Sequence, residues 1–239
     1  REIFEIENTR PHVVILGAGA TIATIPNGDK NGNPCSVMHG FIHNLGLDTI
    51  LATVKLNTKS ENIEDIYSEL YERGDECKAV REQLEEAIFS YLSRLELPAE
   101  ITVYDEIILA LTQKDMIATF NWDPLLIQAY NRARKLTTNL PKLTFLHGNV
   151  AAGYCERCGH FGALQRVKCD NCGAAYHRSP LLFPVKHKDY NSNPFIKQQW
   201  TILNEFLSRA KMLTIFGYSA PKTDVEAAQM LKSAFEKYL

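Results

Sequence analysis

Short apolar runs that end in small or polar residues recur along this chain and alternate with segments of helical periodicity. The first run, 12–16, is rich in β-branched residues and stops at Gly17. Similar runs occupy 115–120, 142–146 and 211–216. A short apolar run bounded by turn residues is typical of a strand buried on both faces, as in a parallel sheet. The pattern therefore predicts an α/β fold.

Apolar positions three and four residues apart predict the helices between these strands. Residues 63–70 form one apolar stripe, and 80–95 form a second. Further helices are predicted over 101–111, 125–135 and 195–209, and from Asp224 onward. The block from about 36 to 112 carries helices without strands, which predicts a helical insertion on the sheet. A strand or edge segment is expected at 181–185, followed by a polar loop at 186–191.

Four cysteines in two closely spaced pairs mark the second half of the chain. They are Cys155, Cys158, Cys169 and Cys172, and a glycine follows the second cysteine of each pair. Four thiolates complete the tetrahedral shell of a structural zinc ion and leave no position open for a substrate. Four unrelated thiols are the alternative, and His160 or His177 is close enough in sequence to replace a ligand.

The segment around these cysteines is too short to bury a core of its own, so zinc binding would supply its folding energy. We therefore expect a zinc-ribbon module at 151–178, inserted into a larger domain. That domain would comprise 1–150, including the helical insertion, and 179–239.

Composition limits the classes of function. The chain has 239 residues, of which 45% are hydrophobic and 23% charged, and its formal net charge is −2. These values are typical of a globular domain and give no basic excess for nucleic acid or an anionic membrane. No apolar run reaches the ~20 residues of a membrane span, and the chain does not begin as a signal peptide does. Only Cys35 and Cys77 remain outside the zinc pairs, which favours a cytoplasmic location.

The turn after the first predicted strand consists of small residues. They are Gly17, Ala18, Gly19, Ala20 and Thr21. Small residues let a ligand approach the backbone, and amides at a helix start can hold phosphate. A dinucleotide fingerprint would need a third glycine where this chain has Ile22, so a plain strand-to-helix turn is the alternative. The loop that follows, 25–34, is long and glycine-containing, and either a mobile lid or a surface connection fits it.

Polar residues follow the second and third predicted strands. Asn121 and Asp123 come after 115–120, and His147 comes after 142–146. Ligands of open α/β sheets bind outside the carboxyl ends of the strands, so these three residues are candidates for a site. Each also has a structural alternative. Asn121 and Asp123 can cap the helix that begins at Pro124, and a lone histidine is often a structural hydrogen-bond partner.

Taken in order, these motifs resemble the sirtuin family along nearly the whole chain. Residues 17–21 resemble its Gly-Ala-Gly-x-Ser nucleotide loop, and 119–123 resemble its Thr-Gln-Asn-Ile-Asp strand end. His147-Gly148 resembles the catalytic His-Gly, and 217–219 resembles the Gly-Thr-Ser turn. The resemblance implies a Rossmann-like parallel sheet, a zinc-ribbon small domain, and NAD bound in the cleft between them. The residues implied for NAD contact are Gly17, Ala18, Gly19, Thr21, Asn121, Asp123, Gly217 and Ser219.

Three departures from the family pattern concern the reaction. Residues 25–30 keep Ile-Pro but lack the Phe-Arg pair that, in the family, shields the ribosyl intermediate from water and orients NAD. Trp122 replaces a smaller aliphatic residue, and 179–191 lacks the Val-Val-Trp-Phe-Gly-Glu pattern that grips an acyl-lysine peptide. The Gly-Tyr-Ser-x-Pro sequence at 217–221 looks instead like the sirtuin-like domains of prokaryotic anti-phage defence proteins, which are similar to NAD glycohydrolases.

The resemblance therefore implies a NAD glycohydrolase with Asn121, Asp123 and His147 as catalytic residues. Cleavage would pass through an oxocarbenium-like transition state, with His147 as general base near neutral pH. A NAD-dependent protein-lysine deacylase and a non-catalytic sensor of NAD or ADP-ribose are the alternatives. A homo-oligomer or a defence partner protein is left open, and no direct binding to nucleic acid or membrane is expected.

Overall fold

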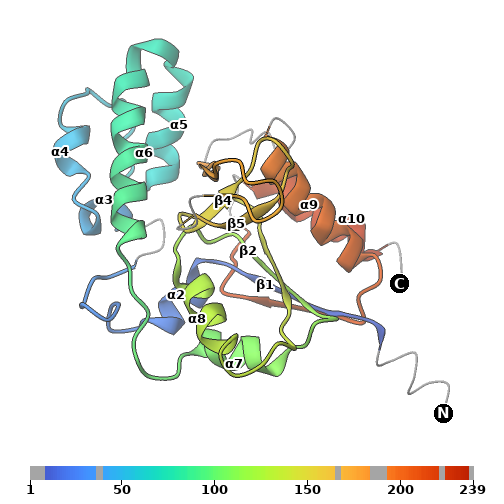
Figure 1. Cartoon of the computed structure of the whole chain (residues 1–239). Coiled ribbons are helices and arrows are strands. Elements are labelled where there is room, and N and C mark those ends of the chain that lie inside the picture. Colours follow the sequence, from blue (N-terminus) through green and yellow to red (C-terminus); the bar gives the residue numbers. More distant parts are fainter. Residues whose placement is uncertain (1–8, 36–39, 165–167, 184–192, 221–223, 237–239) are drawn as a thin grey trace.

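The core of the molecule is a four-stranded, all-parallel sheet in the order β3-β2-β1-β7. The computed structural model describes residues 9–35, 40–164, 168–183, 193–220 and 224–236 (Figure 1). The strands are β1 (His12–Leu16), β2 (Met116–Thr119), β3 (Lys142–Phe145) and β7 (Met212–Phe216). All four lie where the apolar runs predicted them. Because the strands are parallel, their carboxyl ends all lie at the same end of the sheet.

Alternate side chains of the strands enter two apolar cores, one on each face of the sheet. Val14 and Leu16 of β1 point into one core, and Val13 and Ile15 point into the other. The first core is covered by α2 (Ala18–Thr24), α7 (Val103–Ala110) and α8 (Leu125–Ala133). The second is covered by α9 (Pro194–Leu207) and α10 (Val225–Glu236), which lie together on the other side in Figure 1. The predicted α/β fold, with helices on both faces of a parallel sheet, is confirmed.

The predicted helical insertion is present and contains more helices than the two stripes suggested. It comprises α3 (Phe41–Asn44), α4 (Asp48–Leu51), α5 (Ile63–Glu72), η1 (Gly74–Cys77) and α6 (Lys78–Ser93). In Figure 1, α5 and α6 form a hairpin that projects away from the sheet. The helix α7 packs instead against α8 and α2, so it belongs with the layer that covers the sheet. The predicted domain boundaries themselves stay a prediction.

A second, small sheet contains the cysteine segment. It has three antiparallel strands in the order β5-β4-β6, namely β4 (Ala152–Tyr154), β5 (Phe161–Ala163) and β6 (His177–Arg178). The strand expected at 181–185 is not formed at 181–183, where the backbone is irregular. Residues 184 and 185 and the predicted polar loop at 186–191 lie outside the described residues. Within the described part of the chain, no helix is both long and apolar enough to cross a bilayer.

Two contacts join the helical insertion to this small sheet and to the segment after it. Arg178 of β6 pairs with Glu86 of α6 at 2.9 Å and lies 4.1 Å over the ring of Phe89. Phe183 stacks on Tyr67 of α5 with ring centroids 4.9 Å apart. Both contacts connect residues far apart in the sequence, so the two insertions support each other.

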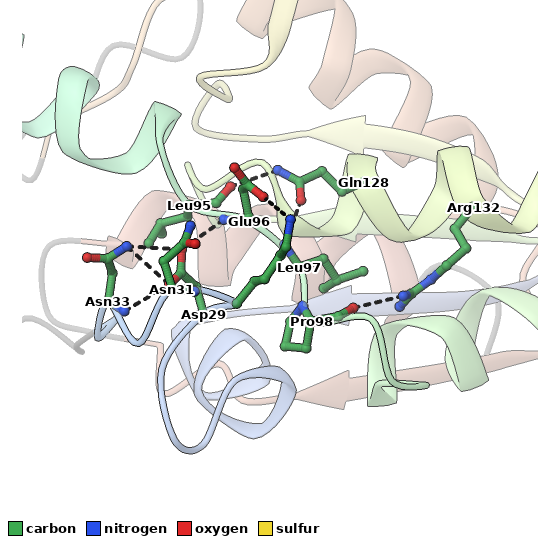
Figure 2. Close-up of polar contacts among 10 residues, drawn as sticks. Asp29, Asn31, Asn33, Leu95, Glu96, Leu97, Pro98, Gln128 and Arg132 are labelled. Atoms are coloured by element: carbon green, nitrogen blue, oxygen red, sulfur yellow. Dashed lines mark hydrogen bonds and ion pairs between the residues drawn. The ribbon is translucent and has the colours of Figure 1, made fainter.

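A buried carboxylate holds the loop at 25–34 in place. Asp29 is 5% exposed, and its Oδ1 accepts hydrogen bonds from the amides of Asn31 (2.9 Å) and Asn33 (2.8 Å). Its Oδ2 accepts from the amide of Glu96 at 2.9 Å, and Lys30 N donates to Glu96 O at 2.9 Å. Figure 2 shows this set of contacts, which we call the Asp29 clasp. The clasp ties the loop to the segment that follows α6.

The other side of that segment is held by α8. Gln128 donates from Nε2 to Leu95 O at 2.8 Å and accepts the amide of Leu97 at Oε1 at 2.7 Å. One helix turn further, Arg132 donates to Pro98 O at 2.8 Å (Figure 2). The segment 95–98 is therefore bound by the clasp on one side and by α8 on the other. A cavity of about 590 Å³ lies beside it, lined by Asn31, Asn33, Tyr91, Ser93, Arg94, Leu95, Glu96 and Gln128.

Candidate functional site

The four cysteines form a cluster that fits a metal ion. Their Sγ atoms all lie within 4.8 Å of one another, with Cys155 and Cys172 at 3.4 Å and Cys158 and Cys169 at 3.5 Å. Zinc–sulfur bonds of about 2.3 Å place sulfur atoms about 3.8 Å apart in a tetrahedron, so these spacings suit zinc. In the described chain no histidine belongs to this group. His177 lies instead 3.8 Å from Glu156.

Two glycines shape the turns that present these thiols. Gly159 and Gly173 have positive φ angles of 68° and 73°. The Gly159 amide donates to Cys155 O and the Gly173 amide to Cys169 O, both at 2.8 Å. The predicted glycine turns are thus present. Four soft thiolates in a closed shell can fasten the small sheet, and they leave no metal position for a substrate.

The glycine turn after β1 packs against the turn after β7. Gly17 N donates to Phe216 O at 3.0 Å, and Gly19 N donates to Gly217 O at 2.9 Å. A Cβ atom on Gly17 would lie 2.5 Å from the Cα of Tyr218, and one on Gly217 would lie 2.1 Å from Ala20 N. Glycine is therefore required here by the approach of two backbone segments, whether or not a ligand binds. Ser219, the last residue of the predicted set, is exposed.

Asn121 lies at the centre of a buried hydrogen-bond network beside this turn. Its Nδ2 lies 2.8 Å from Gly17 O, 2.8 Å from Thr21 Oγ1 and 3.1 Å from Tyr104 OH. Because Gly17 O can only accept, the atom facing it must be the amide nitrogen. The carbonyl oxygen Oδ1 of Asn121 accepts no hydrogen bond from the described residues. The hydrogen bonds of Nδ2 therefore fix the direction of Oδ1, which can accept a hydrogen bond from a ligand.

Each hydroxyl group has a single proton to donate, and this fixes the direction of the hydrogen bonds around Thr21. Thr21 Oγ1 donates its one proton to Asp123 Oδ2 at 2.7 Å. The hydroxyl of Tyr104, 2.9 Å from Thr21 Oγ1, must then be the donor in that pair. Asp123 thus orients the Thr21 hydroxyl, which in turn accepts a hydrogen bond from Asn121. The inward orientation of Thr21, which is 2% exposed, differs from the predicted contact with a diphosphate.

Asp123 is a buried carboxylic acid, 4% exposed, in the segment after β2. Burial raises the pKa of its carboxyl group, although hydrogen bonds from Thr21 and from the Leu125 amide act to lower it. Leu125 N donates to Asp123 Oδ1 at 3.1 Å at the start of α8, although Pro124, and not Asp123 as predicted, occupies the N-cap position. Asp123 therefore serves the helix and the Asn121 network together.

His147 belongs to a second network, formed with residues from the other end of the chain. The imidazole is 6% exposed, and its Nε2 lies 3.8 Å from Oδ1 of Asp224, which is 3% exposed. Tyr218 OH donates to the other carboxylate oxygen of Asp224 at 3.2 Å. Phe120 contacts the imidazole edge to face at 4.8 Å and stacks on Tyr218 at 4.2 Å. Phe120 thus lies between the two rings.

The two networks lie on adjoining strand ends and are joined by Asn149. Asn149 lies two residues after His147. Its Nδ2 donates to Asp123 O at 2.6 Å and to Asn121 O at 3.3 Å. The backbones of the two loops are therefore fixed to each other, as their place on neighbouring strands predicted. The side chains of Asn121 and His147 make separate sets of contacts, and neither residue lines the cavity beside Glu96. A shared cofactor cleft between them stays a prediction.

Sequence reasoning missed several partners in both networks. Tyr104 occupies an apolar position of α7, and nothing in the pattern marks its hydroxyl as an inward hydrogen-bond partner. Asp224 was identified only as the start of the last helix. Its approach to His147 joins segments far apart in the sequence, so it forms only in the folded protein.

Comparisons with known proteins give similarity only to solved structures. No family model matches the chain, and no curated protein matches it. A structure of Sir2 bound to an acetylated peptide shares 19% identity, covering 99% of this chain and 81% of that chain, with a TM-score of 0.44. A structure of Sir2 with a p53 peptide and NAD+ shares 18% identity, covering 98% and 82%, with a TM-score of 0.41. Similarity at this level does not show the function of the chain.

Proposed function

We propose that this protein is a sirtuin-like NAD glycohydrolase, which splits NAD into nicotinamide and ADP-ribose. The observation that carries the proposal is the position of Asn121 and His147 at the carboxyl ends of adjacent parallel strands, beside the glycine turn after β1. This edge of an open α/β sheet is where ligands bind. An amide and an imidazole there can serve water activation and proton transfer.

The reaction breaks the bond between the nicotinamide nitrogen and C1′ of the ribose. The bonding electrons leave with nicotinamide, and positive charge develops on the ribose as in glycoside hydrolysis. A water oxygen then bonds to C1′, and its proton passes to His147 and on to solvent. NAD and water thus yield nicotinamide, ADP-ribose and one proton. The cysteine cluster would hold zinc and stabilise the small sheet, and no step passes through it.

Asn121 would position the attacking water or the nicotinamide amide through its Oδ1. Its Nδ2 already faces Gly17 O, Thr21 and Tyr104, so the carbonyl oxygen has a fixed direction. Thr21, Tyr104 and Asp123 are then positioning residues for Asn121. In the same proposal the diphosphate lies near 17–19, with Gly217 and Ser219 close to phosphate or ribose. Because the amides of Gly19 and Ala20 already have backbone partners, the phosphate would use other donors of this turn or displace these bonds.

Aromatic packing beside the strand end supports hydrolysis over transfer to an acylated peptide. Trp122 is 8% exposed and lies 5.0 Å from the ring of Phe183, which in turn stacks on Tyr67. The protein's own side chains thus occupy the space beside Trp122. The absence of the Phe-Arg pair at 25–30 agrees with access of water to the ribosyl centre. Depletion of cytoplasmic NAD would suit a role in anti-phage defence.

The test is incubation of the full chain with NAD and identification of the products. We expect nicotinamide and ADP-ribose to form without any acylated peptide. His147→Ala and Asn121→Ala should each lower kcat by at least about 100-fold, the usual contribution of general acid–base groups. Zinc content should remain one ion per chain in both variants. His43→Ala is the matched control, because His43 is exposed and lies outside the site.

Other products would identify the alternatives. Strict dependence on an acylated peptide, with transfer of the acyl group to ADP-ribose, would make the protein a deacylase. Binding of NAD or ADP-ribose without turnover would make it a sensor. Full activity of the His147→Ala or Asn121→Ala variant would remove that residue from the mechanism.

A further inference from the structure

A buried carboxylate that has no role in the proposed hydrolysis lies next to the candidate base. Asp224 immediately precedes α10 and is 3% exposed. Its Oδ1 is 3.8 Å from His147 Nε2, and its Oδ2 accepts the hydroxyl of Tyr218 at 3.2 Å. Side chains from the segments after β3 and after β7 therefore meet the residue before α10 at the carboxyl ends of the strands.

The imidazole in this group is fixed from two directions. Phe120 contacts it edge to face at an interplanar angle of 71° and stacks on Tyr218 at 10°. Asp224 faces Nε2, so rotation of the ring would remove that nitrogen from the carboxylate. Hydrogen bonds of catalytic groups are often long before a substrate binds, and closing 3.8 Å to a hydrogen bond needs a shift of about 1 Å.

Because Asp224 and His147 are both buried, the charge of each depends on the charge of the other. An isolated carboxylate out of water is costly, and it is stabilised by an opposite charge within about 4–6 Å. Protonated His147 provides that charge at 3.8 Å. The start of α10 adds a favourable field for a negative group. A charge on either partner is therefore stabilised by the opposite charge on the other.

We propose that Asp224 is the positioning residue for His147, holding Nε2 and balancing the positive charge that the imidazole gains during catalysis. The assignment rests on the proposed NAD hydrolysis. His147 takes the proton of the attacking water on the nitrogen that does not face Asp224, and it later releases that proton to solvent. Asp224 exchanges no proton in this step, and the hydroxyl of Tyr218 donates to its second oxygen.

Among the described residues, few other titratable groups face this pair. Tyr218 reaches it from the segment after β7, and Asp224 raises the pKa of Tyr218 in addition to the larger effect of burial. Glu64 of α5 acts on Tyr218 in the same direction. Phe120, from the segment after β2, brings no charge. Of the contacts described for His147, the one with Asp224 is the contact with a carboxylate.

The direct test is titration of His147 by NMR, with the signal assigned from its loss in a His147→Gln variant. Removing a neighbouring negative charge disfavours the imidazolium. In Asp224→Asn the pKa of His147 should therefore fall by at least about one unit, the usual effect of an adjacent opposite charge. Asp224→Ser is the second variant, and both substitutes are good helix caps, so the start of α10 is kept. Tyr218→Phe, which keeps the carboxylate, should change the pKa of His147 less.

Enzyme kinetics supply the second readout. In Asp224→Asn the acid limb of the pH profile of kcat should move to lower pH by the same amount as the titration. The value of kcat should fall about tenfold or more, while KM for NAD stays within about twofold, and Asp224→Glu should restore part of kcat. An unchanged His147 titration in both uncharged variants would overturn the proposal and reduce Asp224 to a helix cap. A wild-type protein that hydrolyses no NAD would refute the proposed function alone, because the titration still decides the pairing.

Discussion

Asp123 shows how a single buried group links the start of α8 to the candidate site. Its carboxylate accepts the Leu125 amide on one oxygen and the Thr21 hydroxyl on the other. Its pKa is raised above the ordinary value of 3.8 by burial, despite both hydrogen bonds. The folded protein therefore holds a proton on Asp123 at pH values where the unfolded chain has lost it. For this group, stability falls as the pH rises from 3.8 through the raised native pKa.

Replacing Asp123 with asparagine should remove this dependence. The amide keeps an acceptor for Leu125 N or Thr21 but carries no charge to bury. We expect the stability of Asp123→Asn relative to wild type to increase as the pH rises above 3.8. Urea unfolding of both proteins at several pH values measures the difference. A difference that does not change with pH would mean that the native pKa of Asp123 is not raised.

At the residue scale, the sequence predicted where polar groups lie but not what they touch. Asn121, Asp123 and His147 were expected at strand ends, and each is there. Their partners come from distant segments. Tyr104 reaches Asn121 across 17 residues, and Thr21 reaches it across 100. No local pattern encodes such contacts, because they form only when the strands have taken their order in the sheet.

Among the elements, the loop at 25–34 differs most from its prediction. Its glycines and prolines suggested a surface connection or a mobile lid, yet Asp29 fastens it to Glu96. Burial acts to raise the pKa of Asp29, but backbone hydrogen bonds from Glu96 and Asn33 outweigh it and the pKa is lowered. The stabilisation from this group is therefore fully present above its unfolded pKa and is lost as the pH falls through the native value.

Removing the Asp29 clasp should destabilise the protein. Asp29→Ala leaves the part-buried amides of Asn31, Asn33 and Glu96 without their acceptor, which costs about 1–3 kcal/mol. Asp29→Asn keeps one acceptor and should lose less. Urea unfolding at neutral pH measures both. Lys30→Ala is the control, because the exposed pair of Lys30 with Glu96 should contribute at most about 1 kcal/mol. Equal stabilities of wild type and Asp29→Ala would show that the clasp does not hold the loop.

Periodic elements were the easiest to predict from sequence. The stripes at 63–70 and 80–95 became α5 and α6, and the Asn62 side chain caps α5 by accepting from Glu64 N. The strand expected at 181–185 is irregular over its described residues, because this segment packs on the His147 turn, with Leu182 N donating to His147 O. The short helices α3 and α4 were not predicted, since four-residue segments are too short to show a period.

In the whole molecule, the small sheet depends on the cysteine cluster. Its three strands contain only eight residues, too few to bury an apolar core. We expect chelation of zinc to unfold 151–178 while the four-stranded sheet keeps its structure. Hydrogen exchange should show loss of protection in the small sheet and little change in β1 and β2. Cys77→Ala is the control, because Cys77 is buried outside the cluster. Unchanged protection after complete removal of metal would show that the small sheet folds without it.

The strand order also constrains how the protein can be made. In the sheet, β1 lies between β2 and β7, so Val13 is flanked by Met116 and Leu213. During synthesis, the first strand leaves the ribosome long before its second neighbour has been translated. Until then one side of β1 has unpaired backbone groups, which invites pairing with the wrong chain. The hairpin of α5 and α6 and the small sheet are built from contacts between residues close in the sequence. Each can therefore form before β7 has been synthesised. The four-stranded sheet can therefore be completed only after β7 has left the ribosome.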